Sequence, residues 1–204
     1  MKDNKRVSLF IDTATKALAL GAYVGDEGDT LTLENPKEAL EKTNLGIEAL
    51  SRRMGFSLSD VDDFYCLLGP GSNTGIRLGL TIPRTIYAFN PSISLYGIET
   101  LRLFLGHNTD GKSVLSDRNG NLFLETRKDG SDTFERVDKA DIDARFPMDD
   151  TVIVEDSDTL AREELRGRNL IVINTVAQMM ADRDLFEDYS DREEDFLPVY
   201  TQVL

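Results

Sequence analysis

Apolar and polar residues alternate along the first part of the chain with a period that suits strands. Residues 7–13 form a largely apolar run, which predicts a buried strand. Small and apolar residues alternate over 17–24, and another alternating run begins at Thr30, so both are predicted to be strands. The short polar turns between the three runs predict an antiparallel meander.

The apolar spacing changes to that of a helix after Pro36. A helix over residues 36–54 is predicted, because proline suits the first helical position and Gly55 suits the residue that ends a helix. The side chains expected to face the core are Ala39, Leu40, Thr43, Ile47, Leu50 and Met54.

Two more strands then enclose a second helix. The nearly continuous apolar run 63–68 predicts a strand buried on both faces, as in a parallel sheet. Residues 74–89 have a helical pattern, and 92–98 has the pattern of a strand. The order strand, strand, strand, helix, strand, helix, strand predicts a mixed sheet with helices on its faces.

The chain becomes less hydrophobic near residues 100–110, and this change predicts two lobes, residues 1–105 and 106–204. Within the second lobe, Asn119-Gly120 between two short apolar segments predicts a hairpin. Further elements are predicted as strands at 133–137, 151–156 and 169–174 and as helices at 158–167 and 175–190. The sequence shows no internal repeat.

The charge balance is strongly acidic, with 37 acidic and 23 basic residues and a net charge of −14. A surface of this sign repels phosphate backbones, so no stable direct binding of nucleic acid is expected. Most of the excess lies in the C-terminal half, where it is either a solvated face or a surface that meets a basic partner. The first apolar run is too short and too polar for a signal peptide or a membrane span, which predicts a cytoplasmic protein.

One cysteine and one histidine limit the chemistry that the chain can perform. Cys66 stands in an apolar run and is expected to be a buried small hydrophobe, not a reactive thiol. His107 stands in a polar turn with no evident carboxylate to hold it as a base, which argues against a Ser/His/Asp hydrolase. A zinc site, which needs four such ligands, is not expected.

The segment LLGPGSNTGIRLGL, residues 67–80, allows two interpretations. Backbone N–H groups of a glycine-rich turn before a helix can form an anion site, helped by the helix dipole. Alternatively, the turn only redirects the chain into the helix, with Ser72, Asn73 or Thr74 as the N-cap. It matches neither a Walker loop nor G-x-G-x-x-G. The candidate anion or nucleotide residues are Asp12, Thr13, Gly69, Gly71, Ser72, Thr74 and Gly75.

Five segments together resemble the bacterial TsaB (YeaZ) family: IDTAT, GPGSNTGIRLG, YGIETL, DRNGNLFLE and PVYTQ, in this order. The resemblance is strongest over residues 7–105 and thin between about 128 and 195. That family has an actin-like, sugar-kinase-like fold and works with the TsaD subunit in making N6-threonylcarbamoyladenosine in tRNA. The resemblance implies an α/β protein with two lobes, a mixed sheet flanked by helices in the first and a reduced second lobe.

The resemblance also implies that catalysis belongs to the partner. TsaD-type proteins hold a metal with paired histidines on a helix, which this chain lacks. It implies a non-catalytic subunit that binds a TsaD-like enzyme through helices of the first lobe, with a TsaE-like ATPase as a further partner and a homodimer when alone. The expected interface residues are Leu45, Ala49, Arg52, Leu78, Ile82 and Ile86.

An actin-like ATPase or small-molecule kinase is the alternative. In such enzymes the phosphates lie against hairpins whose glycines let the backbone approach, whereas Ala14 and Thr15 stand in this first hairpin. Asp12 is placed to hold a metal–water shell, but Arg118 beside Asp117 in the second hairpin offsets the charge that Mg²⁺ needs. No cofactor is therefore expected beyond weak contact with ATP or ADP.

Overall fold

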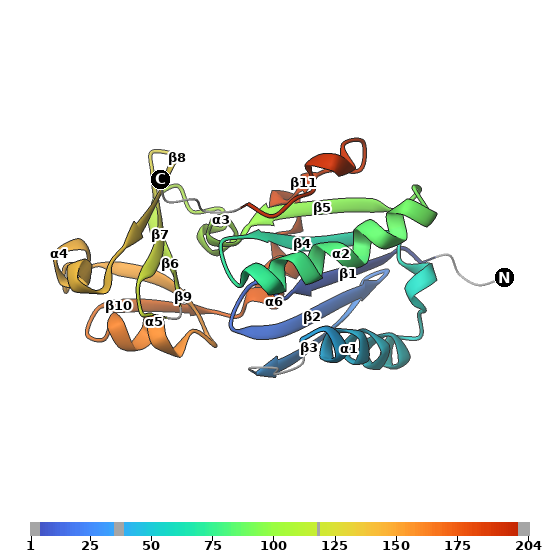
Figure 1. Ribbon diagram of the computed structural model, residues 1–204, viewed down its shortest axis with the longest axis horizontal. Helices are drawn as coiled ribbons and strands as arrows, with labels where there is room; N and C mark the ends of the chain where they lie inside the picture. Colours follow the sequence, from blue (N-terminus) through green and yellow to red (C-terminus); the bar gives the residue numbers. More distant parts are fainter. Residues whose placement is uncertain (1–4, 35–38, 118, 200–204) are drawn as a thin grey trace.

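The computed structural model describes residues 5–34, 39–117 and 119–199, which form two mixed β-sheets with helices packed on them (Figure 1). The first sheet contains, in spatial order, β11 (Glu187–Asp188), β5 (Ser94–Glu99), β4 (Asp63–Gly69), β1 (Val7–Asp12), β2 (Ala17–Val24) and β3 (Glu27–Glu34). The second contains β10 (Asn169–Ile173), β9 (Thr151–Glu155), β6 (Gly111–Ser116), β7 (Leu122–Lys128) and β8 (Ser131–Val137). The predicted α/β class with mixed sheets is confirmed.

Helices cover both faces of the first sheet. On one face, Gly46 of α1 (Ala39–Met54) lies against Leu20, and Gly79 of α2 (Asn73–Phe89) lies against Ile11. Ile11 and Leu20 are cross-strand neighbours, so α1 and α2 share this face. The short helix α6 (Thr175–Ala181) packs against Gly21 on the opposite face.

Apart from β11, the two sheets have the same topology. Each begins with an antiparallel meander of three strands, β1–β2–β3 in the first sheet and β6–β7–β8 in the second. Two later strands, β4 and β5 or β9 and β10, run parallel to the first strand of the meander. The helices between them also correspond: α1, α2 and α3 (Thr100–Leu105) in the first half, and α4 (Ile142–Arg145), α5 (Thr159–Glu164) and α6 in the second. The chain therefore contains a structural repeat that its sequence does not show.

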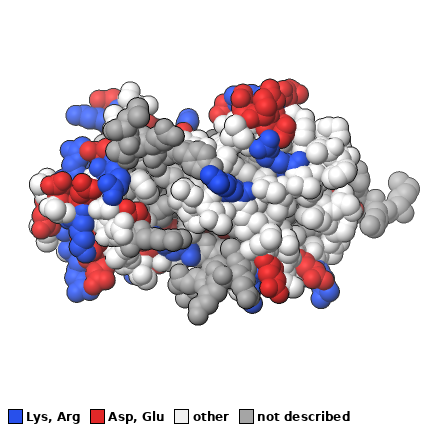
Figure 2. Space-filling view, in the orientation of Figure 1, with Lys and Arg blue, Asp and Glu red and all other residues white. Residues whose placement is uncertain are grey.

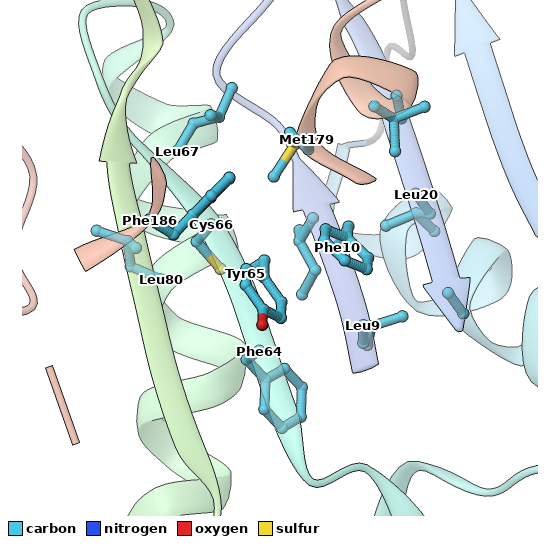
Figure 3. Close-up of a cluster of buried hydrophobic side chains, with 14 of the residues drawn as sticks. Leu9, Phe10, Leu20, Phe64, Tyr65, Cys66, Leu67, Leu80, Met179 and Phe186 are labelled. Atoms are coloured by element: carbon cyan, nitrogen blue, oxygen red, sulfur yellow. The ribbon is translucent and has the colours of Figure 1, made fainter. Parts of the chain in front are cut away.

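The main hydrophobic core lies in the first sheet and contains an aromatic stack on the side of α6. Phe10 stacks on Tyr65 with ring centroids 4.5 Å apart, and Tyr65 stacks on Tyr96 at 4.6 Å. Phe186 meets Tyr65 edge-on at 5.2 Å, and Met179 lies nearby (Figure 3). Offset and edge-on ring pairs of this kind add stability beyond the area that they bury.

The C-terminal segment returns to the first sheet. Val176, Met179, Phe186 and Phe196 belong to the core of that sheet, although they follow the predicted division at residue 105 in sequence. The predicted helix over 175–190 is wrong in length, because α6 ends at Ala181 and β11 then pairs with the open edge of β5. The division into 1–105 and 106–204 stays a prediction. The C-terminal segment belongs to the second part by sequence but packs on the first sheet.

Most other predicted elements lie within a few residues of their observed bounds. β3 begins at Glu27, earlier than predicted, because the turn before it consists of Gly25 and Asp26 only. The predicted start of the first helix at Pro36 lies outside the described residues. Leu40, predicted to face the core, is exposed in the first turn of α1. The predicted core residues Thr43, Ile47 and Leu50 are buried, and so are Gly46 and Ser51.

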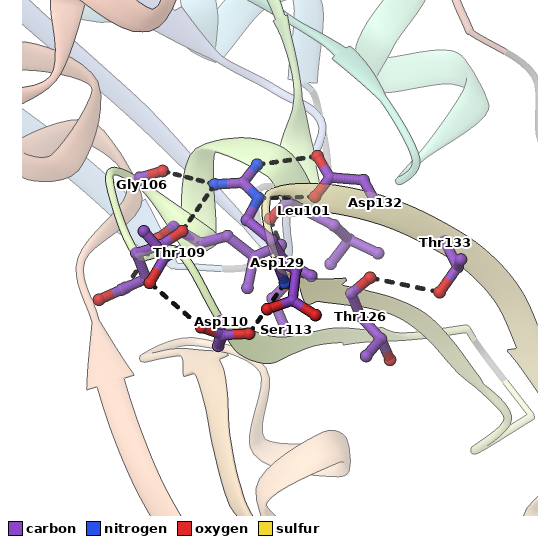
Figure 4. A network of polar contacts seen from close by, with 12 residues as sticks. Leu101, Gly106, Thr109, Asp110, Ser113, Thr126, Asp129, Asp132 and Thr133 are labelled. Carbon is purple, nitrogen blue, oxygen red and sulfur yellow. Dashed lines mark hydrogen bonds and ion pairs between the residues drawn. The ribbon is translucent and has the colours of Figure 1, made fainter.

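A polar network ties the second sheet to the connection that precedes it (Figure 4). Arg127 donates hydrogen bonds to the carbonyl oxygens of Gly106 at 2.8 Å and Asn108 at 3.1 Å. The same guanidinium forms two bonds to the carboxylate of Asp132, at 2.6 and 2.8 Å. A bidentate pair of this kind fixes the orientation of the guanidinium as well as its position.

None of the helices in the described ranges is long and apolar enough to cross a membrane.

Replacing Phe186 by alanine tests the return of the C-terminal segment. Because the ring is buried against Tyr65, the substitution is expected to lower the free energy of unfolding by about 3–5 kcal/mol. The matched control is Phe89→Ala, which removes a ring that is 87% exposed and is expected to change stability by less than about 0.5 kcal/mol. Urea unfolding measures both, and equal losses would contradict the described packing.

Candidate functional site

A cleft of about 990 Å³ lies between the two sheets. The turn before α2 and the hairpin after β1 form one wall, and the end of β6 with the hairpin that follows it forms the other. The side chain of Lys16 crosses the cleft and donates to the carbonyl oxygen of Ser116 at 2.7 Å. The described lining residues are Ala14, Thr15, Lys16, Pro70, Gly71, Ser72, Asn73, Thr74, Arg77, Leu115, Ser116, Asp117, Phe123 and Val199.

The glycine-rich turn packs directly on the first hairpin. The backbone N–H of Ser72 donates to the carbonyl oxygen of Ala14 at 2.8 Å, and the hydroxyl of Thr13 donates to the carbonyl oxygen of Gly75 at 2.6 Å. A Cβ on Gly71 would lie 2.3 Å from the oxygen of Ala14, and one on Gly75 only 1.7 Å from the oxygen of Thr13. These two glycines are therefore required by protein packing, whether or not an anion binds.

Ser72 is the N-cap of α2, since its side chain accepts a hydrogen bond from the N–H of Gly75 at 3.2 Å. This selects one of the three predicted caps, and Thr74 becomes an exposed residue of the first helical turn. Gly69 has a φ of +114°, and a Cβ there would lie 2.8 Å from the carbonyl oxygen of Val199. The C-terminal segment thus closes the far side of the turn.

The carboxylate of Asp12 is used within its own hairpin. It is fully buried; one oxygen accepts from the N–H groups of Ala14 at 2.9 Å and Thr15 at 3.0 Å, and the other from the hydroxyl of Thr15 at 2.6 Å. Burial raises the pKa of Asp12 to about 6, against the opposing effect of these hydrogen bonds. Asp12 therefore shapes the hairpin and does not line the cleft.

Asp117 has the same role in the second hairpin. One oxygen accepts from the N–H groups of Asn119 at 2.7 Å and Asn121 at 3.0 Å, and the other from the side chain of Asn121 at 2.8 Å. Partial burial acts to raise the pKa of Asp117, but these bonds and that of Arg136 hold it below its ordinary value. Arg118, predicted to offset this charge, lies outside the described residues.

Two further carboxyl groups lie behind the cleft. Asp158 caps α5 and accepts hydrogen bonds from the N–H of Ser116 at 2.7 Å, the hydroxyl of Ser116 at 2.6 Å and the N–H of Ala161 at 3.1 Å. Burial, followed by a hydrogen bond shared with Asp156, raises the pKa of Glu155 to about 8. Within the described ranges, no group of three His, Cys, Asp or Glu side chains is placed to hold a metal ion.

The predicted interface residues fall into two groups. Leu45, which is 49% exposed, lies with Ala49 and Arg52 on the outer face of α1. On α2, Leu78 is half-buried, whereas Ile82 and Ile86 pack partly against the main core.

Phe89 was not among the predicted interface residues, although it continues the outer stripe of α2 at helical spacing from Leu78, Ile82 and Thr85. The surface over α2 carries few charged side chains (Figure 2). The exposed stripe on this helix is therefore mainly uncharged.

Cys66 and His107 differ in how they meet their predictions. Cys66 is buried, its thiol donates to the carbonyl oxygen of Gly79 at 3.7 Å, and burial raises its pKa well above the ordinary value, as expected for an unreactive thiol. The expectation that no carboxylate lies near His107 is wrong, since Asp184 lies 3.5 Å and Asp182 4.0 Å from its Nε2 atom. Both belong to the returning segment, and no described serine, threonine or cysteine is hydrogen-bonded to His107.

Two solved structures resemble the chain over nearly its whole length. YeaZ from Pseudomonas aeruginosa superposes with a TM-score of 0.68 and 15% identity, covering 96% of this chain and 99% of that one. The chain has the YeaZ-type actin-like fold. An uncharacterized protein similar to peptidase YeaZ from P. aeruginosa superposes with a TM-score of 0.64 and 16% identity, again over 96% and 99% of the two chains.

Sequence comparison adds a relative whose own role is not assigned. The uncharacterized protein MG208 homolog of Mycoplasma pneumoniae is 29% identical over 132 residues, which are 62% of this chain and 67% of that protein. No family model matches the chain. The likeness to YeaZ at these identities establishes the fold.

Gly75→Ala tests the contact between hairpin and helix. A Cβ 1.7 Å from the oxygen of Thr13 forces the two backbones apart, so unfolding should require about 1–3 kcal/mol less, or more if the contact cannot relax. Thr74→Ala, one residue earlier and exposed, is the control and should change stability by less than about 0.5 kcal/mol. If Gly75→Ala were as stable as this control, the close approach would be contradicted.

Asp12→Asn tests the burial of the carboxylate through pH. Because the folded pKa lies above the unfolded value, the contribution of the protonated group is fully present below about pH 4 and is lost as the pH rises through 6. The stability of the wild type relative to Asp12→Asn should therefore fall by about 2 kcal/mol between pH 4 and pH 7. A difference between the two proteins that does not change with pH would show that Asp12 ionises normally.

Proposed function

We propose that this chain is a TsaB-like, non-catalytic subunit of the machinery that makes N6-threonylcarbamoyladenosine in tRNA in the cytoplasm. The observation that carries the proposal is the use of Asp12 and Asp117 within their own hairpins, in a complete YeaZ-type fold. A phosphate-transferring enzyme needs such carboxylates free to hold its metal ion and water. A chain whose carboxylates have this structural use instead contributes through contact with a catalytic partner.

The proposed partner is a TsaD-like catalytic subunit that docks on the outer faces of α1 and α2. Leu45 and Ala49 are exposed on α1, and Leu78 and Phe89 lie along the uncharged stripe of α2. Apolar side chains at helical spacing on neighbouring helices are what a packed helix–helix interface requires. Arg52, ion-paired with Glu48, would lie at the polar rim. In the absence of the partner, the same face would form a homodimer.

The charge of the chain supports a division of labour within the proposed complex. A net charge of −14 disfavours contact with the tRNA backbone, so tRNA would be bound by the partner. A TsaE-like ATPase is the proposed further member, and it would supply the nucleotide hydrolysis for which this cleft has no free carboxylate in the described residues.

Charge introduced at the helix face tests the proposed interface. Leu45→Glu combined with Leu78→Glu is expected to weaken binding of the TsaD-like subunit from the same organism by more than about tenfold, because each carboxylate would lose water on docking. The control is Phe134→Glu, which alters a residue that is 41% exposed on β8 of the other sheet. Calorimetric titration measures both, and equal affinities would place the interface elsewhere.

Nucleotide turnover separates this proposal from the kinase-like alternative. The isolated chain with ATP and Mg²⁺ is expected to show neither tight binding nor hydrolysis, with Asp12→Asn unchanged from wild type in both assays. Rapid hydrolysis by the chain alone, lost in Asp12→Asn, would overturn the non-catalytic role while leaving the fold intact.

A further inference from the structure

The free edges of the two sheets differ in how they are protected against pairing with another strand. β3 carries Glu27 and Asp29 near its start, and β8 carries Asp132, Glu135 and Arg136. β11 is only two residues long. Charged residues and very short strands are the usual means by which proteins block edge pairing.

β10 has none of these features. Its five residues, NLIVI, include no charge and no proline, and it is the terminal strand of the second sheet. Ile171 is 49% exposed and Val172 47%, although β-branched residues are usually covered in a sheet. β10 is thus an open, apolar edge in a protein whose other edges are blunted.

The backbone of β10 presents hydrogen-bonding groups along this edge. The N–H of Asn169 donates to Asp150 at 3.0 Å, and the carbonyl of Ile173 accepts from Asp156 at 2.9 Å, so the odd-numbered residues face β9. Because the direction alternates along a strand, the N–H and C=O groups of Leu170 and Val172 point away from the sheet. A strand placed there would find both donors and acceptors.

Two arginines stand beside this edge, Arg162 on α5 and Arg166 in the turn that follows this helix. A groove of about 500 Å³ is lined by Thr159, Arg162, Glu163, Arg166, Gly167 and Leu170. Among the described residues, no carboxylate lies within ion-pair distance of Arg162 or Arg166, although Glu163 lines the same groove. Arg162 donates a hydrogen bond to the carbonyl oxygen of Asp156 at 3.1 Å. Most other described arginines of this acidic chain have a carboxylate partner, whereas the groove beside β10 is lined by two arginines and one glutamate and so has a net positive charge.

We propose that β10 is a docking edge for an extended segment of another protein, which pairs with Leu170 and Val172 and places acidic side chains over Arg162 and Arg166. Its alternate side chains, on the other face, would be apolar and cover Ile171. Backbone pairing supplies affinity in this mode of recognition, and the alternating side chains supply specificity. The surface is distinct from the proposed helix interface on the first sheet.

A second copy of the chain fits this edge less well. Antiparallel pairing of two β10 strands about a two-fold axis would place both α5 helices on the same face of the joined sheet. Arg162 and Arg166 of the two copies would then face like charges, and each copy brings a net charge of −14. An extended partner with acidic side chains at these positions avoids the first difficulty, because its carboxylates would meet the two guanidinium groups of the groove.

Two short synthetic peptides with blocked ends and a fluorescent label test the proposal on the isolated chain by anisotropy. One alternates valine with glutamate and the other valine with lysine. The glutamate peptide is expected to bind at least about tenfold more tightly, and Arg162→Glu with Arg166→Glu should reverse that order. Val172→Pro removes one outward N–H without touching the bonds to β9, and should abolish binding of both peptides. Val172→Thr keeps that N–H and is the matched control.

The outcomes separate the possible occupants. Unfolding midpoints establish that each variant is folded, and the charge-reversed variant alone decides the test if Val172→Pro is not. Equal binding of the two peptides, or binding that survives in a folded Val172→Pro variant, would overturn the proposal. Sedimentation that shows a dimer of the wild type and a monomer of Val172→Pro would also overturn it, since the edge would then pair with a second copy. None of these results depends on a TsaD-like subunit.

Discussion

The first sheet depends on the close approach of two stretches of backbone, the hairpin after β1 and the turn before α2. The carbonyl oxygens of Thr13 and Ala14 occupy the space that a Cβ on Gly75 or Gly71 would need. Only glycine permits this approach, and the hydrogen bonds of Thr13 and Ser72 then join hairpin to helix. Strands β1 and β2 and helix α2 consequently form one packed unit, which makes one wall of the cleft.

The same hairpin keeps one carboxylate out of the cleft. The hairpin keeps its shape because Asp12 accepts three hydrogen bonds inside it, and the carboxylate is fully buried there and does not line the cleft. In the turn, the N–H of Ser72 donates to the carbonyl oxygen of Ala14, and the N–H of Gly75 donates to the side chain of Ser72. Among the described residues, the charged side chains that line the cleft are those of Lys16, Arg77 and Asp117.

Sequence patterns predicted the elements whose stability is local. The alternation in β1 and β2, the apolar run of β4 and the helical spacing of α2 each follow from burial of one face or both. The patterns failed where distant segments meet. The segment around Phe186 has the composition of an acidic helix. Strand pairing with the edge of β5 and burial of the Phe186 ring against Tyr65 override that local helix propensity. The two aspartates beside His107 were missed for the same reason, since they lie on that returning segment.

The second half of the repeat makes the equivalent joint between hairpin strand and helix in another way. There, the buried side chain of Asp158 links Ser116 at the end of β6 to the first turn of α5. At the corresponding place in the first half, the hairpin backbone packs directly on the glycines of the turn, and the hydroxyl of Thr13 donates to the carbonyl oxygen of Gly75. A side-chain link of this kind does not require glycine at the contact. The two halves thus share a strand order while using different atoms at this contact. The glycine-rich segment occurs only in the first half, because there backbone carbonyl oxygens pack directly against the glycines.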